Sequence, residues 1–174
     1  LTVGLMLVIL PHLPRLPTFI PIAFFTLAAW RLLGAAGRLP LPDREHRSLM
    51  FLKQLLAVGA FVSVYQALGS GLGREVGVAL LVVLLGLKLL ELQTPRDYYV
   101  VTFLSYFLVI TNFFHSQSMP TAAAMLVVVL FITVGLVSFN DQRNSLKLAD
   151  RARVATRLLI HALPLMLVLF ILFP

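Results

Sequence analysis

The stretch KLLELQTPRDYYVVTFLSYFLVITNFFHSQSMP, residues 88–120, sets a long apolar run between two polar ends. One end carries the charged residues Lys88, Glu91, Arg96 and Asp97, and the other is the HSQS turn at 115–118. The 17 residues between the two ends, Tyr98 to Phe114, carry no Asp, Glu, Lys or Arg. A helix needs about 17–25 apolar residues to cross the hydrocarbon of a bilayer. The stretch therefore predicts a transmembrane helix with a charged hinge at one end and a polar turn at the other.

The composition of the whole chain points the same way. Apolar residues make up 60% of the 174 residues and charged residues only 12%, whereas a soluble domain is about 25% charged. Mean hydropathy is +0.97. The net charge of +7 is spread over short loops rather than one folded face, so we expect the lipid bilayer, and no nucleic acid, as a partner.

No cysteine is present. This excludes a disulfide framework, a thiolate metal site and a cysteine nucleophile from these residues. No two histidines have metal-ligand spacing, and no carboxylate lies close to His115 in the sequence to orient it as a base. We therefore expect no catalytic residue, no metal site and no cofactor in this chain.

Apolar segments recur along the entire chain. They predict an all-α fold, a polytopic membrane helix bundle of about seven helices forming a single membrane domain over 1–174. The predicted helices lie near 1–13, 18–34, 49–68, 74–92, 97–115, 119–139 and 158–173. Because the first apolar run is short and begins at Leu1 rather than Met, we expect the sequence to be a fragment of a longer protein.

Lysine and arginine are distributed unevenly among the predicted loops. Twelve of the 14 fall in or beside 31–53, 88–97 and 140–157, and only Arg15 and Arg74 fall in the alternate loops. Basic residues in short loops mark the cytoplasmic side of a membrane protein. With seven helices, this bias predicts a cytoplasmic N-terminus and a C-terminus on the opposite side.

The segment 140–157, NDQRNSLKLADRARVATR, is the one long polar stretch. Most of its charged residues share one side of a helical wheel, which predicts an amphipathic helix on the cytoplasmic surface, held by anionic lipid. A docking site for a cytoplasmic partner is the alternative interpretation of the same charges.

The charged hinge has two interpretations. Lys88 and Glu91 are three residues apart on one helix face, so they can form an ion pair that anchors the helix end in register. Alternatively, Lys88, Glu91, Arg96 and Asp97 form a buried network that holds the hinge rigid. A proton relay is disfavoured, because no further acid lies deeper in any predicted helix.

The polar turn also has two interpretations. Ser116 or Ser118 caps the next helix, with Pro120 in its first turn. Alternatively, Ser116 and Gln117 contact a domain outside the cytoplasm. On the helix predicted at 49–68, Gly59, Ser63 and Ala67 recur every fourth residue, a spacing that lets membrane helices approach closely.

Four stretches carry a resemblance to a known family. These are GLKLLELQTPRD at 86–97, SYFLVITNFFHSQS at 105–118, RLPLPDRE at 38–45 and HALPLMLVLFILFP at 161–174. Together they resemble the N-terminal membrane domain of the bacterial TgpA-type transglutaminases. The resemblance extends over nearly the whole chain, and its most distinctive parts are the hinge and the polar turn.

The resemblance implies a function that lies mostly outside these residues. In that family a membrane domain precedes a periplasmic transglutaminase-like domain with a Cys-His-Asp triad, which transfers an acyl group from glutamine to an amine. It implies a multi-pass protein of the bacterial inner membrane that anchors, and in a fuller role regulates, such a domain. A cytoplasmic MoxR-type ATPase is an expected partner by analogy.

Two other functions remain open on the residues alone. A small-solute permease or channel component needs polar groups in the middle of the membrane, and only Ser63, Ser105 and His161 come close. A membrane assembly scaffold without an attached enzyme is the other.

Overall fold

The computed structural model describes residues 2–41, 47–68, 73–114, 116, 118–141 and 146–172. Within these ranges the chain is all-helical, with seven α-helices and no strand. The α-helices are α1 (Thr2–Ile9), α2 (Phe19–Ala35), α3 (Arg47–Leu68), α4 (Arg74–Leu90), α5 (Pro95–Asn112), α6 (Met119–Asn140) and α7 (Leu148–Leu172). A short 3₁₀ helix, η1 (Leu10–His12), continues from α1, because Pro11 cannot extend a regular α-helix.

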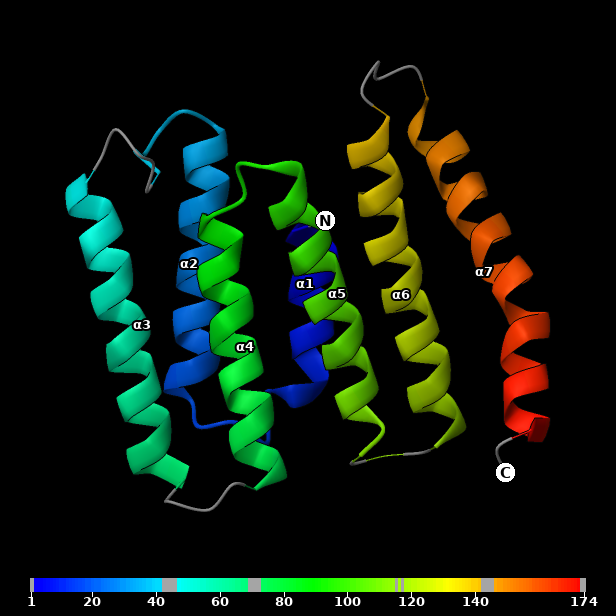
Figure 1. Cartoon of the computed structure of the whole chain (residues 1–174), viewed down its shortest axis with the longest axis horizontal. Coiled ribbons are helices and arrows are strands. Elements are labelled where there is room, and N and C mark those ends of the chain that lie inside the picture. The colour runs from blue at the N-terminus through cyan, green and yellow to red at the C-terminus, as the bar shows by residue number, and fades with distance from the viewer. Residues whose placement is uncertain are drawn as a thin grey trace.

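Consecutive helices run in alternate directions and form a row, with α1 behind α5 in the view of Figure 1. α2 packs on α4, α4 on α5 and α5 on α6, while α1 packs on α5 and α6. The ends of α2, α4 and α6 lie together at the top of Figure 1, and the starts of these helices lie at the bottom. The start of α1 therefore lies toward the upper side of the row and the end of α7 toward its lower side (Figure 1).

The tightly packed part of the molecule is the middle of the row. Phe24 of α2, Leu85 of α4, Leu108 of α5 and Ile132 of α6 are almost completely buried there. The two flanking helices are packed much less, since α3 has α4 as its main neighbour and α7 has α6. Among the described side chains of these two helices, only Val64 and Ala155 are buried.

Two glycines allow the closest approaches between helices in the middle of the row. A Cβ atom on Gly4 of α1 would lie 3.3 Å from the backbone nitrogen of Ile132 in α6. A Cβ atom on Gly86 of α4 would lie 3.1 Å from Leu27 and 3.2 Å from Phe24, both in α2. A larger side chain at either position would have to displace these neighbouring atoms.

The small-residue face predicted on the 49–68 helix does not mediate packing. A Cβ atom on Gly59 meets nothing within 4 Å, and Ser63 and Ala67 are exposed. The prediction is wrong because α3 lies at the edge of the row and turns a different residue, Val64, toward the bundle.

The helix bounds follow local signals in the sequence. The Thr94 hydroxyl accepts a hydrogen bond from the Asp97 backbone, and the Asp97 carboxylate accepts one from the Thr94 backbone, which forms a capping box before α5. The Ser118 hydroxyl accepts a hydrogen bond from the Thr121 backbone at the start of α6. The cap interpretation of the polar turn is thus confirmed for Ser118.

The last helix differs from the expected arrangement. Residues 148–157, expected as part of a separate amphipathic segment, are instead the first turns of α7, which runs unbroken to Leu172. No glycine or proline occurs from 148 to 163 to end a helix there. Before α7, the Asp141 carboxylate accepts hydrogen bonds from the Leu146 backbone and from Arg151.

Two of the described helices are long and apolar enough to cross a membrane on length and composition alone. They are Phe51–Leu68 within α3 and Met119–Asn140, which is α6. The core helix of a soluble protein can pass the same test, but such a helix is mostly buried. Here only 6% of the first span and 22% of the second is buried inside the bundle.

Candidate functional site

The charged hinge between α4 and α5 forms an ion-pair cluster at the upper end of the bundle, which is the side at the top of Figure 1. Lys88 Nζ lies 2.5 Å from Glu91 Oε2 and 3.9 Å from Asp97 Oδ1. Lys53 of α3 forms a further ion pair with Glu91. The cluster therefore links α3, the end of α4 and the first turn of α5.

Three of the four predicted hinge residues lie in this cluster. Their side chains are 18–32% exposed, so the cluster is partly accessible rather than fully buried. Arg96 is exposed and makes no hydrogen bond or ion pair with any part of the chain that the structure describes.

Lys53 is the member of the cluster that sequence reasoning did not assign to the hinge. It lies 38 residues before Glu91 on a different helix. The sequence did indicate where Lys53 lies along the membrane normal, because Lys53 is in the first turns of a helix predicted to begin on the same side as the 88–97 hinge. That signal places Lys53 at the correct end but cannot select its partner.

The Glu91 carboxylate is held in its ionised form. Burial alone would raise its pKa, but hydrogen bonds and charge attraction from Lys53 and Lys88 outweigh this effect and lower the pKa below its ordinary value of 4.5. Glu91 follows the last residue of α4 and lies outside the helices themselves. A lowered pKa means that the folded state favours the charged form.

This shift predicts an acid-dependent loss of stability. The contribution of ionised Glu91 is fully present above pH 4.5 and disappears as the pH falls through the lowered pKa of the folded state. We expect wild-type protein in detergent to melt a few degrees above Glu91→Gln at pH 7, roughly 2–4 °C for each kcal/mol. The difference should shrink below pH 4.5, and a difference that stays constant down to pH 3 would argue against the ion pairs.

The polar turn at the lower end is an internally bonded cap. The Ser116 hydroxyl lies 3.2 Å from the Ser118 hydroxyl and 2.9 Å from that of Thr121. Ser116 is therefore already engaged with the start of α6, although it is only half-buried. Gln117, the other residue predicted to contact an outer domain, lies outside the described residues.

The two basic residues of the lower end both bind the end of α5. Arg74 Nη1 donates a hydrogen bond to the Phe114 carbonyl oxygen at a distance of 2.7 Å. Arg15 Nη1 lies 3.4 Å from the Asn112 side-chain oxygen and donates to the Pro11 carbonyl at a similar distance. The C-terminal end of a helix has unpaired carbonyl groups and a partial negative charge, and cations stabilise it. Both arginines thus have a structural role that explains their position in otherwise weakly basic loops.

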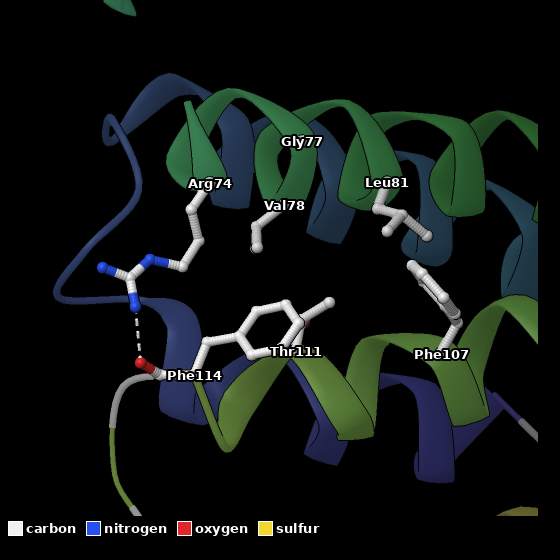
Figure 2. Close-up of a pocket in the computed structure, with 7 residues that line it drawn as sticks. All are labelled: Arg74, Gly77, Val78, Leu81, Phe107, Thr111 and Phe114. Atoms are coloured by element: carbon white, nitrogen blue, oxygen red, sulfur yellow. Dashed lines mark hydrogen bonds between the residues drawn. The ribbon is translucent and has the colours of Figure 1, made fainter. Parts of the chain in front are cut away.

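An apolar groove of about 360 Å³ opens between α4 and α5 beside Arg74. Figure 2 shows side chains from the two helices facing each other across it, with the Arg74–Phe114 hydrogen bond at one end. A second groove, of about 570 Å³, lies between α5, α6 and α7 and is lined almost entirely by apolar side chains. Within the described ranges, no three His, Asp or Glu residues are grouped so that they could hold a metal ion.

The fold and its two polar ends define a class of protein, an all-helical bundle domain with exposed apolar flanks. The whole chain, residues 1–174, matches the model of the family described as the TgpA N-terminal domain. The chain therefore belongs to the TgpA N-terminal domain family.

A curated relative gives the match a wider context. The chain is 33% identical over 174 residues to a protein-glutamine gamma-glutamyltransferase of Pseudomonas aeruginosa. The aligned region covers all of this chain but only 25% of that relative. No solved structure matches the chain.

Proposed function

We propose that this chain is a multi-pass domain of the bacterial inner membrane that anchors a transglutaminase-like domain on the periplasmic side. The observation that carries the proposal is the exposure of large apolar side chains on the flanks of the bundle. Phe51, Val58 and Phe61 on α3 are 57–68% exposed. Exposing such a surface to water costs a free energy of about 25 cal/mol for each Å² of apolar area, whereas contact with lipid avoids this cost.

The same exposure continues on the other flank and along the middle of the row. Leu165 and Met166 on α7 are each 63% exposed, and Phe103 on α5 is 70% exposed. Large contiguous apolar surfaces are rare on soluble monomers and mark membrane or protein contacts. Because the exposed side chains occur on both flanking helices, a surrounding bilayer accounts for them better than a single protein partner.

The positions of charged residues support the proposed orientation. The ion-pair cluster around Glu91 and the Arg151–Asp141 pair both lie at the upper end of the row. Among the described residues, Arg15 and Arg74 are the only arginine or lysine residues at the lower end. Arg74 binds the Phe114 carbonyl and Arg15 binds the Asn112 side chain, both at the end of α5. Under the positive-inside rule the upper end faces the cytoplasm.

The relative's length and name supply the enzymatic part of the proposal. Three quarters of the P. aeruginosa protein lies outside the aligned region, and the name of that protein describes a gamma-glutamyl transfer. Residues 1–174 contain no cysteine, so a thiol nucleophile would have to come from elsewhere in a longer protein. This supports a division in which the present residues hold position and a separate domain performs the acyl transfer.

The permease alternative finds less support. Its three candidate polar residues, Ser63, Ser105 and His161, lie on α3, α5 and α7. α3 and α7 are at opposite flanks of the row (Figure 1), so these residues do not line a common path. The buried Ser105 hydroxyl already donates a hydrogen bond to the Val101 carbonyl, 2.5 Å away.

Fractionation and protease protection test the anchor proposal together. We expect the full-length protein to stay in the membrane pellet after alkaline carbonate extraction. In spheroplasts, added protease should remove the region that follows residue 174 while an internal cytoplasmic marker stays intact. Recovery in the soluble fraction would refute membrane anchoring, and protection of the following region in intact spheroplasts would refute its periplasmic position.

A further inference from the structure

The groove between α4 and α5 has an unusual combination of surfaces. Along its length it is apolar, with Val78 and Leu81 from α4 facing Phe107 and Phe114 from α5 (Figure 2). The half-exposed rings of Phe107 and Phe114 leave it accessible from the side of the bundle. From Arg74 to Leu81 the α4 backbone rises about 10 Å, so the groove runs along the helix rather than into the core.

Among the described residues that line this groove, Arg74 is the one cation, and it lies at one end. Arg74 uses Nη1 to bind the Phe114 carbonyl, and a guanidinium has five N–H donors in total. Arg74 is exposed, so its remaining donors can reach an anion at the lower end of the bundle. Arg15, the other cation of this end, is directed to Asn112 and Pro11 instead.

We infer that this groove binds one anionic phospholipid, with the phosphate on Arg74 and an acyl chain between α4 and α5. The inference rests on the proposed membrane function. A guanidinium recognises phosphate oxygens through paired, charge-assisted hydrogen bonds. With the bundle in a bilayer, Arg74 lies at the headgroup level and the groove leads from it toward the middle of the hydrocarbon, which is the path that an acyl chain takes.

Gly77 lines the groove together with Val78 and Leu81. A Cβ atom added at Gly77 meets nothing within 4 Å, so the groove has room for a larger side chain at this position. The larger groove beside α7 offers a useful contrast, because its lining contains no charged residue. Nothing in that second groove would select an anionic lipid over any other apolar chain.

Native mass spectrometry of the full-length protein in detergent, titrated with phosphatidylglycerol, tests the inference. Arg74→Gln should weaken the tightest phosphatidylglycerol site about tenfold, as expected for the loss of one charge-assisted contact. Arg74→Lys should keep much of the affinity. Gly77→Leu should weaken the same site to a similar extent by filling the groove, and a leucine fits there without disturbing packed neighbours.

Two control variants match these changes in chemistry. Gly59→Leu adds the same side chain to an equally open position on α3, and Arg38→Gln removes an exposed positive charge beyond the end of α2. Both should bind phosphatidylglycerol as the wild type does. Wild-type protein should prefer phosphatidylglycerol over the zwitterionic phosphatidylethanolamine, and Arg74→Gln should lose this preference.

The possible outcomes separate this inference from the proposed function. Unchanged phosphatidylglycerol binding in both Arg74→Gln and Gly77→Leu, with protein extracted from membranes, would overturn the lipid site alone. Weaker binding in Arg74→Gln but not in Gly77→Leu would reject the groove as the position of the acyl chain. Recovery of the full-length protein without detergent from the soluble fraction would overturn both the lipid site and the anchor.

Discussion

An alkaline phosphatase reporter joined after Pro174 is expected to be active, and the same reporter joined after Asn140 is expected to be inactive. Alkaline phosphatase folds into an active enzyme only outside the cytoplasm. Consecutive helices alternate in direction, so the end of α6 lies on the upper side of the row and the end of α7 on the lower side (Figure 1). Twelve of the 14 lysine and arginine residues fall in or beside the sequence segments 31–53, 88–97 and 140–157, the last of which begins with Asn140, so Asn140 should stay inside.

A green fluorescent protein fused at the same two positions provides the matched control, since it fluoresces only when it folds inside. We expect fluorescence after Asn140 and none after Pro174. This prediction has the largest effect, because each reporter is either folded or not. Phosphatase activity after Asn140 would show that the predicted orientation is reversed. Activity at neither position would contradict the prediction that the bundle spans the membrane.

Replacing Glu91 by Gln should destabilise the bundle by about 2 kcal/mol in detergent. The change leaves the ammonium groups of Lys53 and Lys88 close together without a carboxylate between them. Both lysines are at least two-thirds buried, so water compensates for the loss only in part. Thermal or denaturant unfolding of wild type and Glu91→Gln measures the difference.

A double-mutant cycle with Lys53→Met isolates the contact between α3 and the hinge. We expect a coupling energy of about 1 kcal/mol or more between Lys53 and Glu91. Asp150→Asn is the control, because the Arg153–Asp150 pair is 66% and 41% exposed, and such a pair is worth about 0.3–0.5 kcal/mol. Additive effects of Lys53→Met and Glu91→Gln, or a Glu91→Gln cost no larger than that of Asp150→Asn, would contradict the cluster.

The starts of α5 and α6 were predictable because the relevant signals are local. Thr94 and Asp97 form a capping box, and Ser118 precedes Pro120 by two residues. These residues act on backbone groups within one helical turn, so their spacing in the sequence is sufficient. The family membership was likewise predictable from the hinge and the polar turn, and the match over residues 1–174 shows it.

Contacts between helices were much less predictable. The pairing of Lys53 with Glu91 depends on α3 packing beside α4, and no spacing rule links residues 38 positions apart. The glycines illustrate the same limit, since Gly4 and Gly86 mediate close approaches while Gly59 faces open space. A small-residue pattern shows that a helix can approach closely, but the choice of partner and face comes from the assembled bundle.

The attachment of α7 has a mechanical consequence. α7 rests mainly on α6, and Ala155 is its one described side chain that is fully enclosed. A pull or twist applied beyond Leu172 would therefore load the seam between α6 and α7 first, before it strained the interlocked middle helices. Under such a load we expect α7 to separate from α6 while the middle helices, which pack closely at Gly4 and Gly86, stay together.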